Sequence, residues 1–250
     1  MSRVISVANQ KGGVGKTTTA LNIGAAFVAR GRRVLLIDMD PQECLTASLK
    51  IPTPEVGQSL SEVLLGEVPL ARILVEGCGM SLAPAGADLA ETEVRLLAEP
   101  AGEAALREAL TALTVAFDYI IIDCPPSLGL LTLNTLTAAH EVLIPTQTEY
   151  LALRRLGAIL RTIAKVQKRL NPILRVAGIL PTLYDGRTLH AREVLLQIHQ
   201  ALGSEHRIFN PIPRSVRFAE APVMGRPIFE YANDLEGAHA YRTLAEELEQ

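Results

Sequence analysis

Short apolar runs alternate with longer amphipathic segments along most of the chain. Apolar runs predict six strands, at residues 4–8, 34–38, 81–83, 119–123, 142–145 and 176–180. In "VLLID" and "YIIID" successive residues are apolar, which is typical of strands that helices cover on both faces. Apolar residues at helical spacing predict helices at residues 17–30, 59–65, 91–97, 103–113, 130–139, 151–170, 189–202 and 235–247.

The alternation of strand and helix predicts an α/β fold with a doubly wound, mainly parallel sheet that helices flank. No repeat, low-complexity tract or Pro/Gly/Ser-rich linker interrupts the chain, so we expect one domain over residues 1–250. No apolar run approaches the roughly 18–20 residues that span a membrane. The strand-like run at residues 4–8 leaves no room for a signal peptide, and we expect a cytoplasmic protein.

Charged residues are distributed unevenly along the chain. Apolar residues make up 48% of the chain, enough for a full core, and the formal net charge is −3. Residues 151–226 nevertheless contain 13 Lys/Arg and 4 Asp/Glu, a net of +9, whereas the rest of the chain has a net of −12. The basic segment either forms ordinary solvated helix faces or provides an anion-binding surface.

The segment "NQKGGVGKTTT" lies between the first predicted strand and the first predicted helix, where a phosphate-binding loop belongs. Its glycines let the main chain approach phosphate oxygens, and the helix N-terminus adds partial positive charge. Lys16 has the position of the lysine that reaches the β- and γ-phosphates, and the Thr17 hydroxyl is placed to ligate Mg²⁺. The expected nucleotide-binding residues of this loop are Gly12, Gly13, Val14, Gly15, Lys16, Thr17 and Thr18.

Acidic residues end two of the predicted buried strands. "VLLIDMDPQ" places Asp38 and Asp40 after one strand, and "YIIIDCPPS" places Asp123 at the end of another. A carboxylate at the end of a strand beside the phosphate-binding loop holds Mg²⁺ directly or through water, and this predicts a metal role for Asp123. Asp38 is expected either to help bind Mg²⁺ or to brace its loop, and Asp40 to orient the attacking water.

Together, "KGGVGKTT", "DMDPQ" and "DCPPS" resemble the motifs of the deviant Walker A ATPases, a P-loop NTPase family that includes ParA/Soj partition proteins, MinD and the nitrogenase iron protein. The resemblance covers essentially the whole chain and implies ATP and Mg²⁺ as cofactors. It also explains why the phosphate-binding loop contains a second lysine, Lys11. Lys11 matches the signature lysine that reaches across a homodimer to the phosphates of the other subunit, and it joins Lys16 and Asp40 as a catalytic residue.

Two motifs in the second half indicate the branch of the family. "LYDGRT" and "IPRSVRFAEAP" resemble motifs of the Soj-type ParA proteins. This resemblance implies that Pro213 lies against adenine, and that Arg187 and Arg217 bind double-stranded DNA without sequence preference. It further implies a nucleoid-associated ATPase for chromosome or plasmid segregation, whose slow hydrolysis a ParB/Spo0J-type centromere-binding protein stimulates.

Other branches of the family remain alternatives. A membrane-cycling regulator like MinD needs a basic amphipathic C-terminal helix, whereas the last predicted helix here has an acidic outer face. An iron protein needs paired cluster cysteines, and Cys78 and Cys124 do not lie in its motifs. A related positioning ATPase with a cargo other than DNA stays open. The chain also departs from the family where Glu43-Cys44 follows "DPQ", which affects the switch loop, and where Ser215 replaces the usual Asn.

Overall fold

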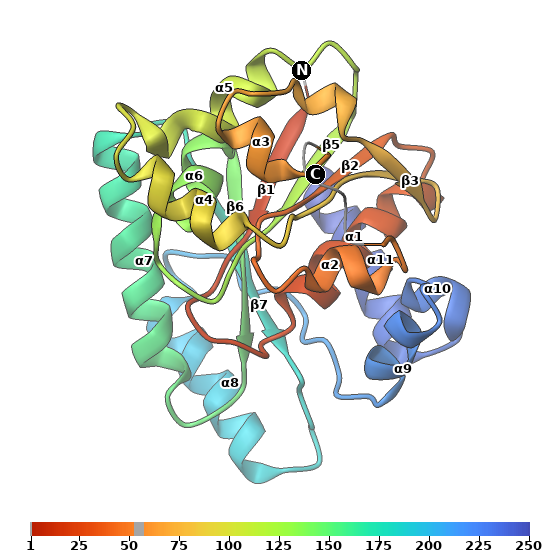
Figure 1. Cartoon of the computed structure of the whole chain (residues 1–250). Helices are drawn as coiled ribbons and strands as arrows, with labels where there is room; N and C mark the ends of the chain where they lie inside the picture. Colours follow the sequence, from red (N-terminus) through yellow and green to blue (C-terminus); the bar gives the residue numbers. More distant parts are fainter. Residues whose placement is uncertain (1, 53–57) are drawn as a thin grey trace.

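The computed structural model describes residues 2–52 and 58–250, so Met1 and residues 53–57 of the expected 1–250 domain lie outside the described part. A twisted seven-stranded sheet forms its centre, in the order β3-β4-β2-β5-β1-β6-β7 (Figure 1). Neighbouring strands are parallel except for β3 and β4. The predicted doubly wound α/β fold is confirmed. The strands are β1 Arg3–Val7, β2 Val34–Asp38, β3 Val75–Gly77, β4 Met80–Ala83, β5 Tyr119–Asp123, β6 Glu141–Gln147 and β7 Arg175–Thr182.

Helices cover both faces of the sheet because successive strand residues point to opposite sides. Ile120 and Ile122 of β5 belong to one apolar cluster, and Tyr119 and Ile121 belong to the other. The first cluster lies beneath α3 Leu60–Leu64, α4 Leu89–Leu96, α5 Ala105–Thr111, α6 Leu130–Ala138, α7 Ala152–Arg169 and α8 Leu189–Leu202. The second lies beneath α1 Lys16–Ala29, α2 Cys44–Ser48, α9 Arg217–Val223, α10 Ile228–Tyr231 and α11 Glu236–Glu249. Single 3₁₀ turns occur at η1 Leu70–Arg72 and η2 Gly102–Ala104.

The central position of β1 fixes where a site can form. β1 pairs with β5 on one side and with β6 on the other, and β5 pairs in turn with β2. In these registers Val7 and Asp38 are each the partner of Asp123. Parallel strands present their carboxyl ends at the same edge, so the loops after β1, β2, β5 and β6 meet there.

In the described part of the chain, the sequence patterns missed the 3₁₀ turn η1 and four short strands and helices. The strand β3 and the helices α2, α9 and α10 each have three to seven residues, too few for a periodic pattern. α9 also contains Pro222, which a sequence pattern treats as a helix stop. The two last strands extend beyond the predicted ends, at residues 141–147 and 175–182.

The C-terminal helix packs on the protein itself. Tyr241, Leu244 and Leu248 of α11 are buried in the cluster beneath α1, and the Tyr241 hydroxyl is 3.1 Å from the Thr19 hydroxyl. Within residues 2–52 and 58–250, no helix combines the length and the apolar character that a membrane crossing requires.

Candidate nucleotide-binding site

The loop between β1 and α1 has the backbone conformation that its glycines predict. Gly13 and Gly15 have φ angles of 72° and 84°, in the left-handed region where other residues are strained. Gly15 is the N-cap of α1, so the first free amides of the helix lie at the end of the loop. Gly12 has no such φ; a Cβ there would lie 3.9 Å from Pro126, which follows the strand that ends in Asp123. Nothing lies within 4 Å of a Cβ built on Gly13 or Gly15, so the loop is open on that side.

Neighbouring strand ends hold this loop in place. The Thr182 hydroxyl at the end of β7 donates to the Val14 carbonyl at 2.8 Å. Asn9 donates from its side-chain amide to the Pro145 carbonyl of β6 at 2.6 Å and accepts from the Lys11 amide at 3.1 Å. These contacts anchor the loop to the carboxyl ends of β6 and β7.

Lys16 is buried, with 6% of its surface exposed, and its ammonium donates to the Lys11 carbonyl at 3.3 Å. No acidic side chain forms an ion pair with it among the described residues. A buried ammonium whose protein partner is a carbonyl is suited to an anionic ligand, because the ligand supplies the missing countercharge. Thr17 and Thr18 follow in the first turn of α1, both half-buried.

Lys11 is held by its own chain. Its ammonium donates to Gln147 Oε1 at 2.7 Å and to Glu149 Oε2 at 2.6 Å, just beyond β6. Arg155 of α7 pairs with the same carboxylate. Burial and the nearby Arg155 charge lower the pKa of Lys11. A role for Lys11 in a second subunit requires that this ion pair opens.

The two strand-end aspartates lie in register but have different surroundings. Asp38 accepts hydrogen bonds from the amide and the hydroxyl of Thr46, both at 2.8 Å, and from the Asp40 amide at 3.2 Å. Burial raises its pKa to about 6 despite these bonds. The carboxylate therefore holds the loop that leads into α2, and its expected help in binding Mg²⁺ stays a prediction.

Asp123 is fully buried, and neither of its oxygens has a hydrogen-bond partner in the described structure. Burial, and next the Asp38 charge, raise its pKa well above the ordinary value, while Thr17 and Lys16 favour its charged form. The Thr17 hydroxyl is thus near Asp123 without bonding geometry. A carboxylate with this environment is suited to a cation, since nothing else satisfies its oxygens.

Asp40 lies on the loop after β2, 7% exposed, and accepts from the Gln42 amide at 3.0 Å. Glu43 follows with a φ of 53° and caps α2. A glycine adopts this conformation without strain, whereas a residue with a Cβ, such as Glu43, is strained in it. The departure from the family motif at Glu43-Cys44 therefore coincides with a strained turn in the loop after β2.

The downstream motifs meet next to β7. Tyr184 and Pro213 form a parallel bridge, and the Ile212 amide donates to the Pro181 carbonyl at 2.8 Å. Because Thr182 contacts Val14, the Pro213 segment is linked to the phosphate-binding loop through β7. Arg187 and Arg217 follow these two segments.

Both of these arginines are at the surface and are paired within the chain. The Arg187 side chain is 90% exposed and pairs with Asp185 at 2.7 Å. Arg217 is 53% exposed and pairs with Glu220 at 2.8 Å. Either guanidinium would have to exchange its carboxylate for a phosphate to contact nucleic acid.

Sequence reasoning missed four residues that organise the site: Thr46, Gln147, Glu149 and Thr182. Gln147, Glu149 and Thr182 lie at or just beyond the carboxyl ends of β6 and β7, and the rule that sites form at this edge could have found them. Thr46 lies in α2, which no pattern predicted.

A family model described as an AAA domain matches residues 2–176. The chain is 46% identical over 246 residues to the chromosome-partitioning ATPase Soj of Thermus thermophilus, covering 98% of this chain and 95% of that protein. It is 43% identical to the chromosome partitioning protein ParA of Myxococcus xanthus, covering 99% and 88%. The chain belongs to the ParA/Soj family of P-loop ATPases. The resemblance inferred from the motifs is confirmed.

A solved structure is also similar over nearly the whole chain. It is named cobyrinic acid a,c-diamide synthase from Mycobacterium smegmatis and contains a bound ATP analogue and magnesium. It is 49% identical, with a TM-score of 0.87, and the match covers 98% of this chain and 93% of that one. This similar structure supports the fold and shows ATP analogue and magnesium bound by a closely similar chain.

Proposed function

We propose that this ParA/Soj family member is a Mg²⁺-dependent ATPase that segregates a chromosome or plasmid. ATP drives a sandwich dimer, the dimer binds double-stranded DNA without sequence preference on the nucleoid, and a ParB/Spo0J-type protein stimulates slow hydrolysis. The observation that carries the proposal is the unpartnered, buried Asp123 carboxylate beside an open loop with two lysines.

The residues present fit ATP and Mg²⁺. The backbone of residues 12–15 and Lys16 would hold the phosphates, Thr17 and Asp123 would hold the cation, and Pro213 would lie against the base. The described residues contain no group of three or more His, Cys, Asp or Glu that could hold a metal, so phosphate oxygens and water would complete the coordination. Bound Mg²⁺ would neutralise charge on the transferring phosphoryl group.

Asp40 is proposed to position the attacking water, because it lies beyond the strand on a loop that Asp38 anchors. Lys11 is proposed to leave Glu149 and to reach the phosphates of the partner subunit. A cation delivered in this way stabilises charge that develops in the transition state. It also makes the nucleotide part of the dimer interface.

Lys11→Ala tests the dimer. We expect this variant to keep much of the monomeric ATP binding and to lose ATP-driven dimerisation and hydrolysis, measured by light scattering and phosphate release. Wild-type dimerisation and turnover in Lys11→Ala would exclude a role across the interface. Glu149→Gln is the matched variant, because it removes the negative charge of the intrachain ion pair and should not impair dimerisation.

Arg217→Glu tests DNA binding. The variant should bind DNA more weakly at all sequences, with a shallower dependence on salt, because phosphate contacts release counterions. Arg33→Glu is the control, since Arg33 is also exposed and also pairs with an acid, Asp118, but lies outside the basic segment. Equal loss in both variants would show that the effect is one of net charge.

ATP-dependent amide synthesis is the second candidate function, because the similar solved structure is named a cobyrinic acid a,c-diamide synthase. An ATP-dependent synthase would turn over ATP only with its acid and nitrogen donor, whereas the proposed ATPase responds to DNA and a centromere-bound partner. Phosphate release with DNA alone, and with an added corrinoid acid and glutamine, separates the two. ATP-dependent liposome binding without DNA binding would instead favour a MinD-like regulator.

A further inference from the structure

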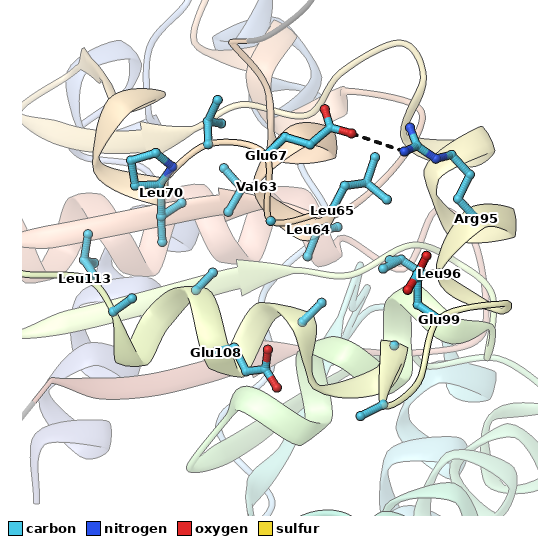
Figure 2. A pocket seen from close by; sticks show the side chains of 18 of the residues that line it. Val63, Leu64, Leu65, Glu67, Leu70, Arg95, Leu96, Glu99, Glu108 and Leu113 are labelled. Carbon is cyan, nitrogen blue, oxygen red and sulfur yellow. Dashed lines mark hydrogen bonds and ion pairs between the residues drawn. The ribbon is translucent and has the colours of Figure 1, made fainter.

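A groove lies on the opposite side of the sheet from α1, between α3, η1, α4 and α5 (Figure 2). Its volume is about 830 Å³, and no residue proposed for nucleotide or DNA binding lines it. The groove is thus a feature that the proposed function does not use.

Apolar side chains form the floor of the groove. Leu64, Leu70 and Leu96 are almost fully buried beneath it, and Leu65 and Leu113 are partly exposed along it. The wall from α5 has small residues at helical spacing, which leaves room for side chains to enter; these residues are Ala105, Ala109 and Ala112. A volume in this range accommodates several side chains of a bound segment.

Acidic side chains surround this floor. Glu67, Glu99 and Glu108 line the groove and are exposed, and Arg95 is the one basic residue among the described residues that line it. Arg95 pairs with Glu67 at 3.2 Å, the contact drawn in Figure 2. The surrounding residues 58–113 contain nine acidic and three basic residues, a net of −6. The groove therefore combines an apolar interior with a negative rim.

We propose that this groove docks a short amphipathic segment of a protein partner, which inserts apolar anchors and presents Lys or Arg to Glu99 and Glu108. Charge complementarity decides the class of occupant. The rim repels nucleic-acid phosphates and acidic peptides, and it steers cationic peptides toward the groove. The apolar floor supplies the area that anchor side chains bury.

Phage display tests this docking even though the partner protein is not identified. A library of random dodecapeptides is panned against the wild-type chain, with counter-selection against Glu99→Lys/Glu108→Lys. We expect enrichment of peptides that combine Lys/Arg with large apolar residues. A synthetic peptide from the enriched pool should bind the double variant at least about tenfold more weakly in fluorescence anisotropy.

Glu76→Lys/Glu91→Lys is the matched control, because it makes the same charge change at exposed positions of the same acidic segment outside the groove. The control should keep wild-type peptide affinity. Circular dichroism checks that both double variants are folded. Equal weakening in the control, enrichment of acidic or uncharged peptides, or no enrichment over the variant would each overturn the proposal.

Two further readouts separate this docking from other possibilities. Peptide binding is measured without nucleotide, so it can fail or succeed independently of the proposed ATPase function. Sedimentation of the wild-type chain and of Glu99→Lys/Glu108→Lys tests whether a second copy occupies the groove. Self-association that only the wild type shows would overturn the partner peptide in favour of a homotypic contact.

Discussion

The carboxyl ends of β2 and β5 lie side by side, and each has a buried aspartate. Asp38 has three protein donors, and Asp123 has none among the residues that the structure describes. The difference comes from the residues that follow. The chain after Asp38 turns back so that Thr46 and the Asp40 amide reach the carboxylate. Asp123 is instead followed by Cys124 and then by two prolines, and the prolines have no N–H group to donate. The aspartate at one strand end is satisfied by the protein, and the aspartate at the other is the one for which we propose a cation.

Removal of the unpartnered carboxylate should have the largest effect on activity. Asp123→Ala should lower Mg²⁺-dependent ATP hydrolysis by at least about 100-fold, because a missing charged contact in the transition state is worth several kcal/mol. Phosphate release measured against Mg²⁺ concentration checks this. Hydrolysis within a few-fold of the wild type would assign the cation to another residue and remove the contrast with Asp38.

Removal of the Thr46 hydroxyl, which donates to Asp38 at the end of β2, should lower the stability of the protein. Thr46→Val leaves the buried Asp38 without its hydroxyl partner, so the free energy of unfolding should fall by about 1–3 kcal/mol. Urea denaturation measures this fall. Thr46→Ser keeps the hydroxyl and should lose less. An unchanged unfolding free energy in Thr46→Val would show that Asp38 does not depend on this bond.

The two aspartates should also differ in how they link stability to pH. Burial raises both pKa values, so the folded protein keeps protons that the unfolded chain has lost, and each group favours unfolding as pH rises above about 4. For Asp38 this dependence should end near its pKa of about 6; for Asp123 it should continue to higher pH. Without metal or nucleotide, the change in melting temperature that Asp123→Asn causes should therefore become more favourable from pH 5 to pH 8. The change caused by Asp38→Asn should level off above pH 6. If the melting-temperature changes of the two variants depended on pH in the same way, the expected difference between Asp38 and Asp123 would be wrong.

The smallest expected effect concerns the strained turn after β2. Glu43→Gly should raise the free energy of unfolding by up to about 1 kcal/mol, because glycine adopts the left-handed conformation without strain. Glu43→Ala keeps the Cβ and should bring no such gain. Thermal unfolding of the two variants distinguishes the backbone effect from the loss of the carboxylate.

Local patterns predicted much of this architecture. The phosphate-binding loop, α1 and the strand-end aspartates follow from glycine spacing and apolar runs, because these features depend on neighbours in the chain. Residues such as Thr46 and Glu149 did not follow, because their partners are set by how loops fold back at the sheet edge. The groove between α3 and α5 likewise depends on the packing of helices, which periodicity does not describe.

The central place of β1 has a consequence for synthesis of the chain. β1 is made first, but its two neighbours, β5 and β6, begin 116 and 138 residues after it begins. Until the ribosome has released residue 147, the apolar residues of β1 lack the strands that flank them in the sheet. The nascent chain must therefore extend through residue 147 before both neighbours of β1 are present, and it can assemble its nucleotide pocket only after that residue.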